Sequence, residues 1–484
     1  MIFPAAHINS PASMFGHTFL RINSKHNSKL LSYAVNYAAD ADPKKENAFS
    51  FAIKGLFGGY YGKYSLLPYY EKLKEYRDAE QRDIWEYDLD LNEKETKRML
   101  DHIWELNGTS SYYYFFTENC SYNMLWFIEA ARPSIYLREY FHFEVTPLET
   151  VHALKEEGII TQKHYRPSKR TILLKYEELL TSNNLSIPKK LINNELSLKK
   201  LLNNKSINIE QKQYILEATI EFLEYSYKKN SMNKEEFLQL FHQLSSSRAN
   251  LGKGETLKIS TPFNPIYGHR AIRVSSGFGY RDKELVEFIG IRPTYHDLDD
   301  IQHGFLRGTQ IEFLNLELSY SELKNGNSLQ IEKATILSIV SLAQRSEFFD
   351  SLSWRTKFGF DRNFLQDDKA NFLASAGFGF SWGSEIGYFY TMIDPFLYLH
   401  DKISIGTGAS LGFIVDSFDW MNINIEGISR IYDDSEIQYL VNISQNIKLS
   451  QNFKLQFNYN YTSRYIDKID KEEQTLKTML SFYF

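Results

Sequence analysis

The chain of 484 residues has a formal net charge of −5 at pH 7 and a pI near 6.2, which gives no electrostatic basis for binding nucleic acid. Its 33 tyrosines and 35 phenylalanines accompany a mean hydropathy of −0.40, a combination common where aromatic belts meet a membrane and unusual in soluble enzymes. One cysteine excludes an internal disulfide, and a chain of this length is typical of about three domains.

The amino terminus lacks the features of an export signal. The opening residues, MIFPAAHINSPASMFG, have neither a basic start nor a long apolar core, and no run of about 18 consecutive apolar residues occurs in the chain. We therefore expect no transmembrane helix. If the protein is exported, its leader or a further N-terminal segment lies outside this sequence.

Residues 10–22, SPASMFGHTFLRI, pass from a loop into an alternating pattern that predicts a short strand with His17 at its mouth, where a catalytic imidazole could lie. The run at 31–40, LLSYAVNYAA, predicts a second strand that carries Asn36 on one side. Asn36 is placed to orient the second ring nitrogen of His17, as in a Cys–His–Asn set.

The lone cysteine lies in TENCSYNMLWFIEA, residues 117–130. The apolar residues that follow Cys120 have the spacing of a helix with one buried face, and Asn119 is a good N-cap for it. The thiol should therefore lie in the first helical turn, where free backbone N–H groups and the helix dipole favour thiolate over thiol.

Both residues also have ordinary structural interpretations. A lone free cysteine is more often a packing residue than a nucleophile, and His17 fits equally well as a hydrogen-bonded residue at a strand end. Arg77, Arg82 and Asp83 fit a structural ion-pair cluster as well as they fit a functional site.

The blocks SPASMFGHTFLRI, AVNYAA, EYRDAEQRDIWEY and ENCSYNMLWFIEAARP resemble the Lnb N-terminal periplasmic domain family over roughly residues 1–165. That family is named for a lipoprotein N-acyltransferase and belongs to the circularly permuted branch of papain-like folds, in which the histidine strand precedes the cysteine helix. The order of His17 and Cys120 matches. The resemblance implies a thiol acyltransferase or hydrolase.

From about residue 166 to 253, four segments rich in Lys, Asn, Leu and Glu carry helical periodicity. We expect a helical connector here, with its lysines on a solvated face. An anionic membrane surface is the alternative partner for these lysines.

From 254 to 484 the pattern has period two, in about twelve segments separated by turns. A soluble sandwich also alternates, but segments of about ten residues, aromatic residues at their ends and a small or charged polar face favour a transmembrane barrel. A barrel would also close its sheet edges. The last segment ends at Phe484, which resembles the insertion signal of bacterial outer-membrane barrels.

A second potential nucleophile, Ser381, lies in GFSWG at 379–383, which fits the G-x-S-x-G pattern of hydrolases. That pattern requires a strand, a turn and then a helix, whereas here a turn leads into another strand. We interpret Ser381 as a chance match, although a serine site on a twelve-stranded outer-membrane barrel has a precedent among phospholipases.

The resemblance implies an α+β domain of permuted papain-like fold (1–165) in the periplasm. The patterns predict a helical connector (166–253) and an antiparallel outer-membrane barrel of about 12 strands (254–484). The resemblance and the location imply a membrane-anchored acyltransferase for lipid-linked acyl groups, such as those of phospholipids or lipoproteins. Cys120 would be the nucleophile, His17 the base and then the acid, and Asn36 the orienting residue.

Two alternatives remain open. A peptidoglycan amidase or a lipid hydrolase would use the same Cys–His pair, and a non-enzymatic protein would make the barrel a pore or scaffold with a degenerate Cys domain. The sequence has no HExxH pattern and no Cys/His cluster, so we expect neither a metal nor an organic cofactor.

Overall fold

The computed structural model describes residues 1–6, 15–23, 29–40, 54–55, 58–229, 232–323, 326–365, 369–466 and 469–484. These residues form two compact units. The first spans Phe15–Pro262, together with the first residues of the chain and Ser346–Asp350; the second spans Phe263–Arg345 and Ser351–Phe484.

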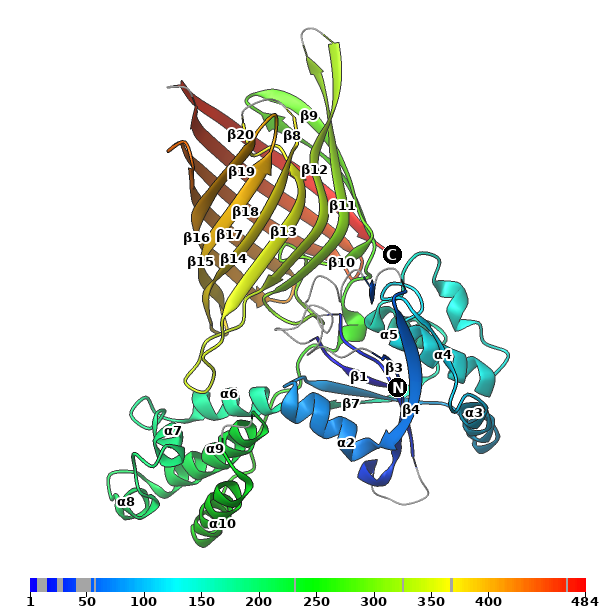
Figure 1. The fold of residues 1–484 in the computed structure, drawn as a ribbon, viewed down its shortest axis with the longest axis vertical. Helices are drawn as coiled ribbons and strands as arrows, with labels where there is room; N and C mark the ends of the chain where they lie inside the picture. Colours follow the sequence, from blue (N-terminus) through cyan, green and yellow to red (C-terminus); the bar gives the residue numbers. More distant parts are fainter. Residues whose placement is uncertain are drawn as a thin grey trace. The chain divides into compact units, whose positions relative to one another are not determined.

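The N-terminal part of the first unit is built on two small antiparallel sheets with helices between their strands (Figure 1). One sheet has the order β2 (Leu20–Ile22), β3 (Tyr33–Ala39), β4 (Tyr60–Pro68) and β6 (Ser110–Tyr113), and the other β1 (Ile2–Pro4), β5 (Ile84–Leu89) and β7 (Ile160–Arg166). The helical elements are η2 (Lys29–Leu31), α2 (Tyr69–Leu73), η3 (Lys74–Ala79), α3 (Glu93–Glu105), α4 (Cys120–Ala131), η4 (Leu137–Tyr140) and α5 (Pro147–Glu156).

A buried carboxylate ties the two sheets together. Glu86, on β5, is fully buried and accepts hydrogen bonds from Arg21 on β2 at 2.5 Å, from the Tyr69 hydroxyl at 2.7 Å and from Arg166 on β7. Burial alone would raise the pKa of Glu86, but these hydrogen bonds and the charge of Arg21 lower it to about 2. The charged network therefore fixes β2, and with it the chain that leads into β2, against β5 and β7.

The helical part of this unit follows directly. It consists of α6 (Lys169–Leu179), α7 (Ile187–Ile192), α8 (Leu198–Asn203), α9 (Ile209–Lys228) and α10 (Lys234–Asn250). Ser168, Ser197, Asn208 and Asn233 cap four of these helices by accepting from a backbone N–H in the first turn. Among the described residues, no helix is both long and apolar enough to cross a membrane.

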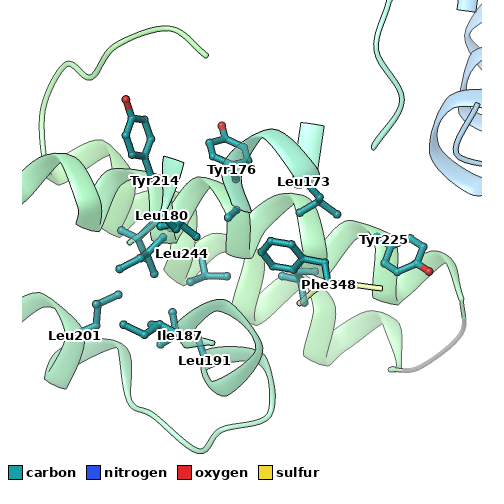
Figure 2. Packing of buried hydrophobic residues seen from close by; sticks show 14 of the residues in the cluster. Leu173, Tyr176, Leu180, Ile187, Leu191, Leu201, Tyr214, Tyr225, Leu244 and Phe348 are labelled. Carbon is teal, nitrogen blue, oxygen red and sulfur yellow. The ribbon is translucent and has the colours of Figure 1, made fainter. Parts of the chain in front are cut away.

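Part of the core of this helical bundle comes from much later in the chain. Leucine, isoleucine and tyrosine side chains of the bundle enclose Phe348, as Figure 2 shows. The ring of Phe348 lies 5.2 Å from that of Phe222, and the ring of Phe349 lies 5.3 Å from that of Tyr225. Both phenylalanines are almost completely buried, so the segment Ser346–Asp350 is an integral part of the helical core.

The second unit is a closed antiparallel barrel (Figure 1). Its strands are β8 (Arg273–Arg281), β9 (Glu284–Arg292), β11 (Thr309–Leu323), β12 (Gly326–Ser341), β13 (Ser353–Asp361), β14 (Asn371–Gly383), β15 (Gly387–Leu399), β16 (Ile403–Phe418), β17 (Met421–Tyr432), β18 (Ile437–Ser450), β19 (Phe453–Ile466) and β20 (Ile469–Tyr483), with the short β10 (Thr294–His296) beside β11. The last strand pairs with β8, and β9 pairs with β11, which closes the cylinder. The predicted α+β region, helical stretch and barrel of about 12 strands are confirmed.

The alternation seen in the sequence separates the two faces of the barrel wall. On β16, Ile403, Ile405 and Leu411 are exposed on the outside, whereas Ser404 and Ser410 are buried inside. The same alternation along the other strands gives an apolar exterior and a polar interior, as a transmembrane barrel requires.

A charge placed on the outer face should therefore destabilise the barrel in a membrane. We expect Leu411→Arg, near the middle of β16, to lower the free energy of unfolding from lipid vesicles by roughly 2–4 kcal/mol. Asp401→Arg is the control, because the Asp401 side chain is 97% exposed in the turn before β16. Denaturant titration followed by heat-modifiable gel migration measures both; equal stability of the two variants would contradict an exterior that faces lipid.

Candidate functional site

His17 lies just before β2. The predicted strand begins at Leu20, with an isolated bridge between Ile2 and Phe19, so His17 precedes the regular pairing. Its position is nevertheless fixed, because its backbone N–H donates to the carbonyl of Pro4 on β1 at 3.2 Å. The loop-to-strand transition thus places the imidazole at the edge of the core.

The structure brings His17 and Asn36 together. The two atoms Nε2 of His17 and Oδ1 of Asn36 are 2.7 Å apart, and Asn36 is buried on β3. Because an amide oxygen only accepts, Nε2 carries the hydrogen and the lone pair of the neutral ring lies on Nδ1. The imidazole is therefore oriented with Nδ1 available as a base.

The imidazole is held in its neutral form. Burial lowers the pKa of His17 to about 3; the hydrogen bond to Asn36 opposes this shift, and the charges of Arg82 and Lys72 add to it. The ring also stacks on Tyr76, with centroids 5.5 Å apart. At neutral pH, His17 can accept a proton but does not hold one in the resting state.

Cys120 is the first residue of α4, as predicted. The side chain of Asn119 caps the helix by accepting from the backbone N–H groups of Ser121 at 3.0 Å and Tyr122 at 3.1 Å. Its amide nitrogen donates to the carbonyl of Val145 at 2.6 Å, which anchors the cap itself. The cysteine is only 5% exposed.

The thiol of Cys120 lies against the segment that carries His17. The backbone of Thr18, the residue after His17, and the side chain of Tyr113 lie close enough to its sulfur to counter part of the rise in the pKa of the thiol. The hydroxyl of Tyr113 also accepts from the backbone N–H of Cys120 at 3.2 Å. The structure thus gathers Cys120, His17 and Asn36, from distant parts of the chain, into one region.

The expected thiolate at the helix start is wrong for the resting protein. Burial raises the pKa of the Cys120 thiol and outweighs the hydrogen bonds from Thr18 and Tyr113 and the charge of Arg82, which lower it. A helix terminus stabilises an anion only modestly, whereas the desolvation of a buried thiolate costs more. In the resting site the thiol and the imidazole are therefore both neutral.

The contacts that two neighbours make with this site were not evident from the sequence. Tyr113 lies at the end of β6, and nothing in its local pattern marks its hydroxyl as a partner of Cys120. Arg82 donates to the carbonyls of Pro4 at 2.9 Å and Ala5 at 2.5 Å. The sequence is compatible with Arg82 in an ion-pair cluster, and Arg82 does pair with Glu80 at 2.9 Å, but its other hydrogen bonds hold the backbone of Pro4 and Ala5.

Ser381 lies in a different environment. It is fully buried within β14, and its hydroxyl accepts from Ser353 at 2.9 Å. Among the contacts of the described chain, no histidine or carboxylate is hydrogen-bonded to this hydroxyl. The strand–turn–helix context of a nucleophilic serine is therefore missing, in line with a chance match.

One group of residues in the barrel unit has the composition of a metal site. Potential ligand atoms of His269, His296 and Asp300 all lie within 4.8 Å of one another. Asp300, however, already pairs with Arg292 at 2.6 Å and with Lys454 at 3.0 Å, so its charge is compensated by cations that would repel a metal ion. These residues fit an internal ion-pair network better than a metal centre.

Three family models match successive parts of the chain. Residues 1–157 match the Lnb N-terminal periplasmic domain, residues 163–258 a domain of unknown function (DUF7842) and residues 262–483 a second domain of unknown function (DUF7840). No curated protein matches the chain. A periplasmic domain family and a closed barrel with an apolar exterior confirm the predicted location in the bacterial outer membrane, with the N-terminal domain in the periplasm.

Solved structures of outer-membrane barrels are similar to the barrel unit. The KdgM porin in complex with disordered oligogalacturonate has 10% identity and a TM-score of 0.26, with 44% of this chain and 99% of that chain covered. The NanC porin has 8% identity and a TM-score of 0.28 (44% and 100% covered), and an outer membrane channel from Pseudomonas putida F1 has 10% identity and a TM-score of 0.28 (46% and 97% covered). Likenesses this distant carry no functional argument.

The electrostatics of the thiol can be tested by alkylation, because Cys120 is the single cysteine and a label reports on it alone. We expect its alkylation rate by iodoacetamide to keep rising with pH beyond about 8.5, the ordinary pKa of a thiol. The Tyr113 hydroxyl lowers the pKa of the thiol in the wild-type protein. Its removal in Tyr113→Phe should therefore raise that pKa and shift the profile to still higher pH. Tyr112→Phe, whose ring is exposed on the same strand, is the control and should leave the profile unchanged. A wild-type profile centred below about 8.5 would contradict the buried, neutral thiol.

Proposed function

We propose that this protein, which joins an Lnb N-terminal periplasmic domain to an outer-membrane barrel, is a thiol acyltransferase that moves a lipid-linked acyl group through a thioester on Cys120. The observation that carries the proposal is the hydrogen bond of 2.7 Å between His17 and Asn36, which leaves Nδ1 of the imidazole as a free base in the region of the Cys120 thiol. A cysteine that only fills space has no need of an oriented, neutral imidazole in the same region.

In the first half of the reaction, Nδ1 of His17 takes the proton of the Cys120 thiol as the sulfur attacks the carbonyl carbon of the acyl ester. Because the resting pair is neutral, the proton moves during the attack rather than before it. The tetrahedral intermediate then collapses, the bond to the alcohol oxygen breaks, and His17 returns the proton to the leaving alcohol. The acyl group remains on Cys120 as a thioester.

In the second half, an amine attacks the thioester carbonyl and His17 accepts a proton from its nitrogen. Collapse of this intermediate breaks the carbon–sulfur bond and gives an amide, and His17 passes its proton to the leaving sulfur, which restores the thiol. Asn36 holds the ring in one orientation through both halves, since the bond to Nε2 is compatible with the neutral ring and with the imidazolium.

The negative oxygen of each tetrahedral intermediate needs hydrogen-bond donors close to the sulfur. The backbone N–H of Cys120 and the hydroxyl of Tyr113 meet at 3.2 Å in the resting site. When a carbonyl oxygen enters, both groups can turn toward it as donors. Tyr113 is held for this role by the packing of its ring on Tyr37, with centroids 5.6 Å apart.

The burial of Cys120 favours transfer to an amine over hydrolysis. Because Cys120 is only 5% exposed, water has little access to the carbon that would form the thioester. A chain anchored in the outer membrane also meets phospholipid acyl chains and the amino termini of lipoproteins at that membrane. Phospholipid is therefore the proposed donor and a lipoprotein-like amine the proposed acceptor.

Product analysis separates this proposal from its alternatives. Purified protein in detergent is incubated with phospholipid and a diacylated lipopeptide, and the products are identified by mass spectrometry. We expect the mass of the lipopeptide to increase by one acyl group. Free fatty acid formed at the same rate with and without acceptor would identify a lipid hydrolase instead. If the protein releases products from purified cell wall and none from the lipid substrates, it is an amidase.

Substitutions at the site should separate reacting groups from an orienting group. We expect Cys120→Ala and His17→Ala each to lower kcat by about 10⁴-fold or more, because the nucleophile and its base act as one unit. Asn36→Ala should cost less, since the imidazole remains and only its orientation is lost. Ser381→Ala is the matched control and should leave turnover unchanged. If Ser381→Ala loses turnover while Cys120→Ala retains it, the nucleophile is Ser381 and the proposal for Cys120 is wrong.

The pH profile tests the protonation state of the base. With the pKa of His17 lowered to about 3, the ring stays neutral through mildly acidic pH, so kcat/KM should show no acid limb until the pH approaches 3–4. A limb near about 6.5, the ordinary pKa of histidine, would contradict the lowered pKa of His17. Initial rates between pH 4 and 8, with circular dichroism at each pH to confirm folding, provide the measurement.

A further inference from the structure

The interior of the barrel is occupied at both of its ends by segments of the same chain. We propose that the barrel is a closed membrane anchor that does not conduct ions or small solutes. This inference concerns the barrel alone and does not depend on the activity proposed for Cys120.

The first closing segment, residues 297–305, connects β10 to β11 and folds into the interior. Its Asp299 is bonded to inward-facing side chains of three neighbouring strands: Asn424 on β17 at 3.2 Å, Ser444 on β18 at 2.5 Å and Gln456 on β19 at 3.2 Å. One short acidic segment thus spans a quarter of the barrel wall from the inside. It is anchored to the wall rather than resting near it.

The next residue extends this attachment around the same end. Asp300, with no exposed surface, pairs with Arg292 on β9 at 2.6 Å, with Arg273 on β8 at 3.2 Å and with Lys454 on β19 at 3.0 Å, and it also accepts from the hydroxyl of Tyr483 on β20. The charges are balanced by these cations and lie out of water. Displacing the segment would leave arginine and lysine side chains unpaired inside the barrel, which is strongly unfavourable.

The segment itself is compact. Backbone hydrogen bonds join Asp300 to Asp297 at 3.0 Å and Phe305 to Gln302 at 3.1 Å, and the ring of Phe305 stacks on that of His296 at 4.1 Å. The closure is therefore a folded element with its own packing.

The second closing segment is Arg362–Leu365, which follows β13 at the other end of the strands. The carbonyl of Phe364 accepts from Arg464 on β19 at 2.8 Å, and the carbonyl of Asn363 accepts from Gln438 on β18. The ring of Phe364 is fully buried, 4.8 Å from that of Tyr398, with the guanidinium of Arg464 over it at 4.2 Å. Here the interior is filled by an aromatic cluster.

Between the two segments lies a cavity of about 410 Å³ crossed by ion pairs. Arg355 on β13 pairs with Asp394 on β15 at 2.6 Å and with Glu426 on β17. Arg362 joins Glu332 on β12 to Glu473 on β20, strands that are not neighbours in the sheet, at 3.2 Å each. A solute moving along the axis would therefore meet a folded plug, a set of paired charges and an aromatic cluster.

Conductance across planar lipid bilayers tests the proposal directly. We expect the full-length wild-type protein to give no current steps, with its insertion verified by heat-modifiable migration of the same sample on gels. Because both ends are closed, Asp299→Ala with Asp300→Ala, and Phe364→Gly alone, should each remain silent, whereas the combined variant should conduct. Stable current steps from the wild type, or from Phe364→Gly alone, would overturn the proposal.

A labelling experiment covers the case in which the combined variant does not fold. In a Cys120→Ser background, Ser375→Cys places a thiol on the cavity wall and Lys402→Cys places one in the exposed turn before β16. A charged, membrane-impermeant thiol reagent should modify the turn position to completion while the cavity position stays unmodified. Modification of both at the same rate would show that the interior is open to solutes.

Discussion

Closure of the barrel is the constraint from which most of this molecule follows. In a hydrocarbon environment every backbone N–H and C=O must be paired within the chain, and the pairings of β20 with β8 and of β9 with β11 leave no free edge in the cylinder. A closed cylinder has only two faces, so the side chains that cannot contact lipid must point inward. Charged side chains of the strands consequently lie in the interior, where their ion pairs and hydrogen bonds hold residues 297–305 and Arg362–Leu365 in place.

The barrel was predictable from the sequence because its signal is local. Alternation such as that of Ile403 to Phe413 assigns each residue to a face without reference to the rest of the chain. The grouping of His17, Asn36 and Cys120 also followed from local features, namely a loop-to-strand transition, a strand and a capped helix, together with a family resemblance. Their catalytic roles remain a proposal, but their positions are now defined by the bond between His17 and Asn36 and by the contacts of the Cys120 thiol.

The features that escaped prediction depend on how elements pack against one another, which no local pattern shows. The protonation of Cys120 is decided by burial, which no local pattern reveals, and the partnership of Tyr113 with it arises only when β6 and α4 meet. Polar stretches such as 297–305 have the composition of surface loops and would be assigned to solvent. They are internal here because Asp300 pairs with cations on strands of the barrel wall, the most distant of which, Lys454, lies 154 residues further along the chain.

Phe348 and Phe349, from the connection between β12 and β13, pack into the core of the helical bundle, and this affects the maturation of the protein. A chain exported from its amino end delivers α6–α10 before the connection between β12 and β13 that completes their core. Until that connection arrives, the rings of Phe222 and Tyr225 lack their partners, and the bundle presents an apolar surface that periplasmic chaperones recognise and proteases can attack. A chain whose β12–β13 connection is misplaced would therefore expose apolar surface in the helical bundle as well as in the barrel.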